Sequence, residues 1–373
     1  MSNKFFKEIE KNFGFGFMRL PMNADSIDME QTKQMVDLFI KNGFNYFDTA
    51  HIYHEGMSEI AIREAISERY AREQFVLTNK LSTHCFESQE EIRPLFEEQL
   101  KACGVTYFDF YLMHAQDRKI YEKYRCCKAY ETSLELKAEG KIKHFGISFH
   151  DKADVLERIL TDYPEIEVVQ IQFNYVDYDD ASVEGRKVYE VCEKFNKPVI
   201  VMEPVKGGSL VHLPENAQKI FDNLHANKSN ASYALRFAGS FKNICVVLSG
   251  MSNISQVQDN ISFMKDFQPL NATEMEAVQK VCQIFRSMNM IPCTACHYCT
   301  DGCPMKIRIP DVFSCYNLKT KFHSWNQDYY YDILTHENGK ASDCIKCGQC
   351  EEICPQHLKI TELLEDVAKE FEK

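Results

Sequence analysis

The chain has 373 residues, long enough for one large domain and a small one, or for two to three domains of average size. Hydrophobic residues make up 45% of it, which is ordinary for a globular protein with a sizeable core. Its formal net charge of −12 argues against nucleic acid or an anionic membrane surface as the main partner. No stretch approaches the roughly 18 apolar residues of a membrane span, and the N-terminal MSNKFFKEIEKNFG has no apolar signal region, so we expect a cytoplasmic protein.

From residue 17 to about residue 265, short β-like runs alternate with helical segments. Several runs are almost continuously apolar, as in strands buried on both faces. Helical segments lie between them; in the one over 89–104, we expect Pro94 to kink the helix or shift its start, and Gly104 to end it. The eight β-like runs are residues 17–20, 46–50, 75–79, 108–114, 144–149, 168–174, 198–204 and 245–250.

Eight strands alternating with helices over about 250 residues predict a (β/α)8 TIM barrel, an α/β fold. A doubly wound open sheet is the competing fold, but no G-x-G-x-x-G follows the first predicted strand and opens a helix. The glycines of 14–21 come before that strand and indicate a turn.

The composition changes near Pro292, from alternating β-like and helical runs to Cys, Pro and short polar segments. A helix is expected over 271–290, just before the change. We therefore predict a barrel domain over residues 1–290 and a small α+β or helical domain over residues 291–373.

The second domain holds two copies of the motif C-x2-C-x2-C-x3-C-P, offset by 51 residues. Without a secretory signal, such cysteines indicate metal or redox chemistry rather than disulfides. A pair of structural zinc sites is the alternative, but zinc sites do not call for three close ligands and a proline-flanked fourth. The other eight cysteines are scattered, and we expect them to be reduced and mostly buried. The motif cysteines are Cys293, Cys296, Cys299 and Cys303, then Cys344, Cys347, Cys350 and Cys354.

This motif resembles the bacterial ferredoxins that carry two 4Fe-4S clusters, and the match covers both copies in full. The resemblance implies a ferredoxin-like domain with crossed ligation, in which each fourth cysteine binds the cluster of the other motif. Cys354 would then complete the cluster of Cys293, Cys296 and Cys299. Cys303 would complete the cluster of Cys344, Cys347 and Cys350.

In the barrel, nearly every predicted strand delivers a polar side chain at its carboxyl end. Active sites of TIM barrels form at that end, whereas a purely structural core would continue apolar there. The polar residues are Asp48, Lys80, His114, Ser148, Gln170, Asn174, Glu203 and Ser249. The sequence therefore predicts an active site at the carboxyl end of the barrel.

Three segments, GFNYFDTAHIYHEGMSE, TNK and YLMH, resemble the aldo-keto reductase family, and the resemblance extends over residues 14–265. It implies an oxidoreductase that reduces or oxidises a small carbonyl or alcohol substrate. It also implies a catalytic tetrad of Asp48, Tyr53, Lys80 and His114. Taken singly, Asp48 and Lys80 would be a structural ion pair, Tyr53 a loop aromatic and His114 a core histidine; their coincidence at successive strand ends favours catalysis.

The chemistry of the four residues supports this assignment. A free tyrosine has a pKa near ~10, too high for an efficient general acid at neutral pH. A lysine ammonium beside Tyr53 favours the phenolate, and Asp48 supplies the partner that a buried Lys80 needs. His114 is placed to donate a hydrogen bond to the substrate oxygen.

The cofactor site departs from the family pattern. Phe149 replaces the usual Asn, Met202 takes the place of a stacking aromatic, and no basic residue lies between 249 and 260. We therefore expect NADPH or NADH, with flavin mononucleotide (FMN) as the alternative. The predicted cofactor contacts are Ser148, Gln170, Lys206, Gly207, Gly208, Gly250, Gln256 and Asn260.

Two clusters beside such a barrel suggest electron relay, with a redox partner protein supplying or accepting electrons. Three other functions stay open from the sequence. One is a non-catalytic electron-transfer or regulatory subunit that uses the barrel as a cofactor platform. The second is a flavin-dependent reductase fed by the clusters, and the third is a zinc-dependent interaction module.

Overall fold

The computed structural model describes residues 4–24, 26–180, 183–224, 227–322 and 327–372. The chain divides into two compact units. The barrel unit consists of Met1–Pro204 and Ala231–Asn271, and the C-terminal unit consists of Val205–Asn230 and Ala272–Lys373. In the described residues, no helix is both long and apolar enough to span a bilayer.

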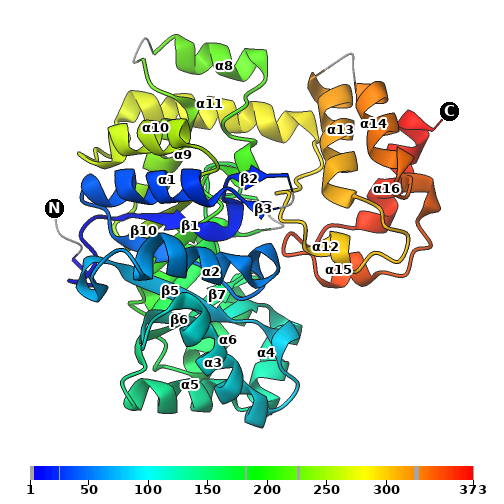
Figure 1. Ribbon diagram of the computed structural model, residues 1–373. Helices are drawn as coiled ribbons and strands as arrows, with labels where there is room; N and C mark the ends of the chain where they lie inside the picture. Colours follow the sequence, from blue (N-terminus) through cyan, green and yellow to red (C-terminus); the bar gives the residue numbers. More distant parts are fainter. Residues whose placement is uncertain (1–3, 25, 181–182, 225–226, 323–326, 373) are drawn as a thin grey trace. The chain divides into compact units, whose positions relative to one another are not determined.

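The barrel unit is built on eight parallel strands that form a closed barrel in the order β1-β10-β9-β8-β7-β6-β5-β4 (Figure 1). Strand β1 closes it by pairing in parallel with both β10 and β4. This confirms the predicted (β/α)8 fold class. The strands are β1 (Phe13–Gly16), β4 (Tyr46–Asp48), β5 (Val76–Leu81), β6 (Phe108–Gln116), β7 (Ile142–Phe149), β8 (Val168–Gln172), β9 (Val199–Met202) and β10 (Ile244–Gly250).

Helices follow the strands around the barrel. Helix α3 begins at Gln89 despite Pro94 in its interior, so its start is not shifted, and it ends as predicted at Gly104, whose φ is +67°. The helices are α1 (Met29–Lys41), α2 (Met57–Ile62), α3 (Gln89–Cys103), α4 (Arg118–Cys126), α5 (Ala129–Ala138), α6 (Ala153–Asp162), α7 (Gly185–Lys194), α9 (Asn230–Gly239) and α10 (Ile254–Met264). A short hairpin, β2 (Met22–Asn23) and β3 (Ser26–Ile27), lies between β1 and α1.

The first strand was predicted at the wrong place. It covers Phe13–Gly16 rather than 17–20, and Phe17–Arg19 forms a 3-10 turn, η1. The glycines therefore belong to the strand and not to a turn before it. A Cβ on Gly14 would lie 2.7 Å from side-chain atoms of Leu248 and Tyr46, so close packing inside the barrel requires glycine there.

Apolar side chains fill the amino-terminal half of the barrel. Val76, Phe110 and Val246 belong to one buried cluster, which Phe6 and Ile9 join from the segment before β1. The rings of Phe6 and Phe110 meet edge to face, with centroids 4.9 Å apart. This packing leaves the carboxyl ends of the strands as the part of the barrel that carries polar chemistry.

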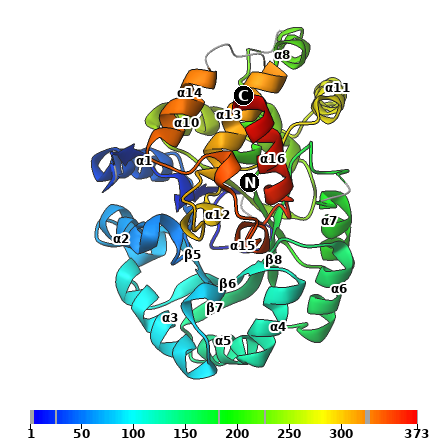
Figure 2. The ribbon, with the colours of Figure 1, turned by 90° about the vertical axis from the view of Figure 1, so that its right-hand side faces the viewer.

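The C-terminal unit is mainly helical. Helix α13 packs against α14 and α16, and α11 packs against α8 (Figures 1 and 2). Val312, Phe313, Leu364 and Val367 form part of its buried core. The helices are α8 (Glu215–Asp222), α11 (Ala272–Met288), α12 (Tyr298–Asp301), α13 (Ile309–Phe322), α14 (Gln327–His336), α15 (Gln349–Glu352) and α16 (Ile360–Phe371).

Candidate active site and cluster sites

Four polar side chains predicted from the sequence meet at the carboxyl ends of β4, β5 and β6. Lys80 is completely buried on β5, and its Nζ donates to Asp48 Oδ1 at 2.6 Å and to the Thr49 carbonyl oxygen at 2.8 Å. The same Nζ lies 3.4 Å from the Tyr53 hydroxyl oxygen. Burial lowers the pKa of Lys80, while the Asp48 carboxylate opposes that shift. The site thus holds one ammonium between a carboxylate and a phenol.

Tyr53 and His114 face each other across this ammonium site. Tyr53 is the first residue of a short 3-10 turn, η2 (Tyr53–Gly56), and its ring is edge-on to the His114 ring with centroids 5.9 Å apart. His114 lies on β6 and is 4% exposed. Its pKa is well below the ordinary value, first because of burial and then because Lys80 and two other histidines are close. The imidazole is therefore neutral at physiological pH.

Gln170 and Ser148, both predicted cofactor contacts, point into the same end of the barrel. Gln170 on β8 donates from Nε2 to Asp48 Oδ2 at 3.1 Å, so Asp48 is held on both oxygens. Ser148 on β7 accepts a 3.4 Å hydrogen bond from the backbone N–H of Ala115. The structure thus connects Gln170 to the tetrad, a contact that the sequence did not predict.

A buried polar network lies behind Lys80, and the sequence reasoning missed it. Asn79 Oδ1 accepts from the Lys80 N–H at 2.8 Å, and Gln99 Nε2 donates to the Lys80 carbonyl oxygen at 2.9 Å. Glu59, 1% exposed, accepts from both amides at 2.8 and 3.2 Å. The peptide of Lys80 is therefore fixed on both sides. The only sequence signal for this network was Asn79 in the segment TNK, directly before Lys80.

A basic residue from outside 249–260 lies near the end of β10. Arg19, just after β1, crosses above Gly250, where an added Cβ would lie 3.2 Å from Arg19 side-chain atoms. Its Nη2 is 3.5 Å from Glu203 Oε1 beyond β9. The aliphatic part of Arg19 thus packs over Gly250, while its guanidinium pairs with Glu203. It went unnoticed in the sequence because residues 17–20 were assigned to a strand.

Gln256 and Asn260 both lie on α10, directly after β10. Gln256 Oε1 accepts from the Ser252 N–H at 2.7 Å and so caps the start of the helix. Asn260 is buried and donates from Nδ2 to Ser249 Oγ at 3.1 Å. Both side chains therefore hold the β10–α10 connection in place.

The Lys206–Gly208 turn, η6, belongs to the C-terminal unit. Gly207 has φ +63°, and a Cβ there would collide with the carbonyl oxygen of Thr294. Thr294 lies inside the first cysteine motif. Within the C-terminal unit, this turn, which holds three of the predicted cofactor contacts, packs against a cysteine loop.

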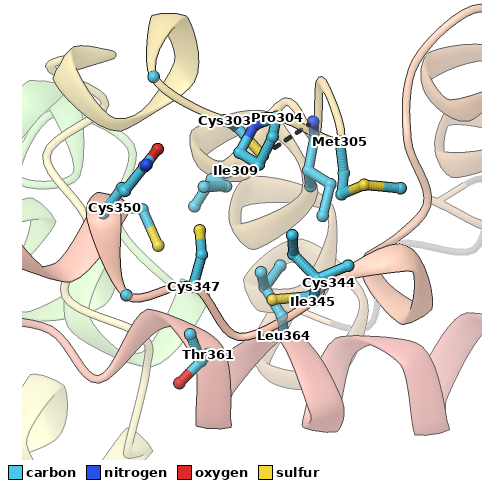
Figure 3. Close-up of a pocket in the computed structure, with 14 residues that line it drawn as sticks. Cys303, Pro304, Met305, Ile309, Cys344, Ile345, Cys347, Cys350, Thr361 and Leu364 are labelled. Carbon is cyan, nitrogen blue, oxygen red and sulfur yellow. Dashed lines mark hydrogen bonds between the residues drawn. The ribbon is translucent and has the colours of Figure 1, made fainter.

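The eight motif cysteines line two pockets, each with about 320 Å³ of space that is partly open to solvent. One pocket combines Cys344, Cys347 and Cys350 with Cys303 of the other motif; Figure 3 shows these four around one space. The second combines Cys293, Cys296 and Cys299 with Cys354. The thiols thus group across the two motifs. In the described residues, no three or more His, Cys, Asp or Glu side chains approach closely enough to hold a single metal ion.

The two motifs also share one backbone conformation. Positive φ angles occur at Ala295 and Lys346, at His297 and Gly348, and at Lys306 and His357, each pair separated by the 51-residue offset of the motifs. Backbone N–H groups donate to Cys293 Sγ and Cys303 Sγ, both at 3.4 Å. Such N–H groups stabilise sulfur that carries negative charge, which fits thiolate ligands of iron.

Burial and crowding of the thiols act against ionisation unless a cation is present. The pKa of Cys350 is raised to about 11, first by burial and then by Cys344, Glu351 and Cys347. The pKa of Cys299 is raised by burial and by thiols that include Cys354 of the other motif. The donor set therefore suits an iron–sulfur cluster, whose irons supply the missing positive charge.

Comparisons with known proteins agree with both units. The model of the "Aldo/keto reductase family" matches residues 12–283, and that of a "4Fe-4S dicluster domain" matches residues 292–358. An uncharacterized oxidoreductase, YqkF of Bacillus subtilis, is 24% identical over 287 residues, 68% of this chain and 89% of its own length. Aldo-keto reductase family 1 member C3 of Pongo abelii is 31% identical over 164 residues, 39% of this chain; that match spans about half, 49%, of the relative's length.

Solved structures show the same barrel. Aldo-keto reductase AKR11C1 from Bacillus halodurans aligns with a TM-score of 0.58 at 24% identity, covering 72% of this chain and 91% of that chain. An aldo-keto reductase from Klebsiella pneumoniae in complex with NADPH aligns with a TM-score of 0.59 at 20% identity, covering 72% of this chain and 90% of that chain. Because the family model spans most of the sequence, the chain belongs to the aldo/keto reductase family and is an oxidoreductase that carries a C-terminal 4Fe-4S domain.

Proposed function

We propose that Asp48, Tyr53, Lys80 and His114 are the catalytic tetrad for reduction of a small carbonyl compound, or for the reverse oxidation of an alcohol. The contact of Lys80 Nζ with Asp48 Oδ1 at 2.6 Å and with the Tyr53 hydroxyl at 3.4 Å carries this proposal. A buried ammonium beside a phenol has little structural purpose, because burying a charge costs several kcal/mol. A buried ammonium does, however, favour the phenolate form of a neighbouring tyrosine, which helps that tyrosine to release its proton.

In the reducing direction, the carbonyl oxygen binds between Tyr53 and His114. A nicotinamide cofactor supplies the hydride when bound. As negative charge develops on the oxygen, the neutral His114 ring donates a hydrogen bond and Tyr53 transfers its proton. Lys80 stabilises the phenolate that Tyr53 leaves behind, and Asp48, held by Gln170, keeps Lys80 in place.

We propose NADPH or NADH as the cofactor, supported by the NADPH complex of the Klebsiella pneumoniae relative. Ser148 and Gln170 would hold the ring; Gly250, Gln256, Asn260 and Arg19 would hold the phosphates. This assignment is supported because Gly250 lacks a side chain and the stem of Arg19 packs over it, with the guanidinium paired to Glu203 nearby. Flavin mononucleotide is the alternative, with the Lys206–Gly208 turn as its phosphate contact.

We propose that the domain of residues 291–373 carries two 4Fe-4S clusters with crossed ligation and relays electrons in the cytoplasm between the barrel and a redox partner protein. Each cluster passes one electron. Two clusters together hold the two electrons of one hydride equivalent, and a flavin, the alternative cofactor of the barrel, could take them up singly and pass them on as a pair. The grouping of the thiols across the motifs supports this cluster arrangement.

The test is the substitution Tyr53→Phe, which keeps the ring and removes the proton. With NADPH and a panel of small aldehydes and ketones, we expect turnover to fall at least about 10²-fold while NADPH binding is unchanged. Tyr70→Phe, at a surface tyrosine that bonds Asp37, is the matched control and should not affect turnover. Near-normal turnover of the Tyr53 variant would refute the tetrad.

A further inference from the structure

Ser82 forms a buried hydrogen bond with the catalytic histidine. Its Oγ lies 2.7 Å from His114 Nδ1, and the two residues are 2% and 4% exposed. Ser82 comes two residues after Lys80 and has extended backbone angles, φ −99° and ψ 131°. Side chains two apart in extended chain point to the same side. Ser82 therefore faces the tetrad for the same reason that Lys80 does.

The relative positions of Ser82 and His114 are fixed by a second contact. The Tyr124 hydroxyl lies within hydrogen-bond distance of the His114 carbonyl oxygen, at 3.0 Å, and of the Leu81 carbonyl oxygen. It thereby joins the ends of β5 and β6 directly beside the Ser82–His114 pair. The backbone that carries Ser82 and His114 is therefore held in place.

The direction of the hydrogen bond follows from the number of donors. Within the described part of the chain, His114 Nδ1 is the only hydrogen-bond partner of the Ser82 hydroxyl. If Nδ1 carried the proton and donated, the hydroxyl proton of Ser82 would be buried without an acceptor, at a cost of about 1–3 kcal/mol. If Ser82 donates, the ring proton lies on Nε2, which is not among the buried polar atoms left without a partner, and the buried pair leaves only lone pairs unused. Ser82 is therefore the donor and Nδ1 the acceptor.

We propose that Ser82 is a positioning residue that fixes His114 as the Nε2–H tautomer, so that the ring presents a neutral donor to the substrate oxygen. The inference rests on the proposed tetrad. It gives His114 a defined role: the ring polarises the carbonyl and stabilises charge on its oxygen, but does not supply the proton. The proton then comes from Tyr53. The neighbouring Lys80, His84 and His150 all disfavour a positive charge on the ring.

The experiment is a long-range ¹⁵N–¹H correlation spectrum of the full-length, cluster-loaded, oxidised protein labelled with ¹⁵N-histidine. The His114 signals are assigned by their loss in His114→Gln. At neutral pH we expect the proton on Nε2 and an unprotonated, hydrogen-bonded Nδ1. A proton on Nδ1, or a doubly protonated ring, would overturn the proposal.

Variants then test whether Ser82 is responsible. Ser82→Thr keeps the hydroxyl and should keep the spectrum, whereas Ser82→Ala should shift the Nδ1 signal or give two tautomers. Ser148→Ala removes a buried serine that contacts the backbone beside His114 but not the ring, and should leave the signals unchanged. Unchanged signals in Ser82→Ala would contradict the role of Ser82. Should Ser82→Ala not fold, the wild-type and threonine spectra still decide the tautomer.

Turnover gives a second measurement. Ser82→Ala should lower the rate of carbonyl reduction roughly ten-fold, less than the roughly 10²-fold cost of losing a donor outright, and Ser82→Thr should restore it. The tautomer itself is measured without turnover. Tyr53→Phe should leave the His114 spectrum unchanged, so failure of the proposed tetrad and failure of the tautomer assignment are separate results.

Discussion

The four predicted catalytic residues lie together because each ends a neighbouring strand or begins the next loop. Parallel strands bring their carboxyl ends to one side of the barrel, and a strong family motif marked each position. The supporting residues Ser82, Glu59 and Gln99 could not be predicted in the same way. Their roles depend on which side chains meet across strands and helices, and a single sequence does not contain that information.

The buried Asp48–Lys80 pair leads to a stability prediction. Asp48→Asn leaves an ammonium buried without its counter-ion, and breaking such a pair costs about 3–5 kcal/mol of unfolding free energy. Urea unfolding of the wild-type and variant holoproteins measures this loss of unfolding free energy. Glu135→Gln breaks an exposed pair with Arg93 and should cost less than about 1 kcal/mol. Equal, small losses in both variants would show that Lys80 is not charged in the folded protein.

His114 leads to a prediction on pH. Its pKa in the folded protein is well below its ordinary value of about 6.5, so the unfolded chain takes up the proton first. The stability linked to His114 is therefore present above pH ~6.5 and is lost as pH falls below it. Between pH 7 and pH 5 the unfolding free energy of the wild-type protein should therefore fall more than that of a variant without this ring. In His114→Gln this part of the pH dependence should disappear; an unchanged pH dependence would contradict the assignment of a neutral, buried ring.

At the scale of elements, seven of the eight strands lie where their β-like runs predicted, with ends that differ by a few residues. The first was misplaced because glycine has a low β propensity, so Phe13–Gly16 looked like a turn. Tertiary packing outweighs this low propensity, because only glycine at position 14 leaves room for the side chains of Leu248 and Tyr46. Arg19 was missed for the same reason, since the true strand ends before it.

The turn after β9 offers a matched pair of variants. Gly207 and Gly208 have φ of +63° and +99°, so alanine is strained at both positions. Only at Gly207 does the new Cβ collide with Thr294; at Gly208 no atom lies within 4 Å. We expect Gly207→Ala, but not Gly208→Ala, to lose iron faster from the cluster of Cys293, Cys296 and Cys299, measured by absorbance and iron content in air. If both variants instead bind NADPH or FMN more weakly, the turn binds a phosphate of the cofactor.

At the scale of the whole molecule, the 51-residue repeat carried more information than its cysteines alone. The two motifs have equivalent backbones, as the paired positive φ angles show, although the sequence analysis did not predict this. The division of the chain could not be predicted from sequence order, because Val205–Asn230 belongs to the C-terminal unit although it comes between two barrel strands. Such a contact between distant segments appears only in three dimensions.

Crossed ligation is tested by Cys303→Ser and Cys354→Ser. We expect the first to damage the cluster of Cys344, Cys347 and Cys350, and the second to damage the cluster of Cys293, Cys296 and Cys299. Anaerobic wild-type protein should contain about eight irons with matching sulfide. Electron paramagnetic resonance of the reduced variants identifies the surviving cluster. Damage to the cluster of the same motif in each variant would show that ligation is not crossed.

The most direct test of the account is anaerobic rapid mixing of cluster-reduced protein with a carbonyl substrate found in the aldehyde and ketone panel, followed at cluster absorbance. If the clusters relay electrons through a cofactor bound in the barrel, they reoxidise as alcohol forms, one alcohol for two electrons, and Tyr53→Phe slows both by at least about 10²-fold. If the clusters stay reduced while NADPH supports normal turnover, and no flavin can be extracted, the barrel works as a reductase without electron relay.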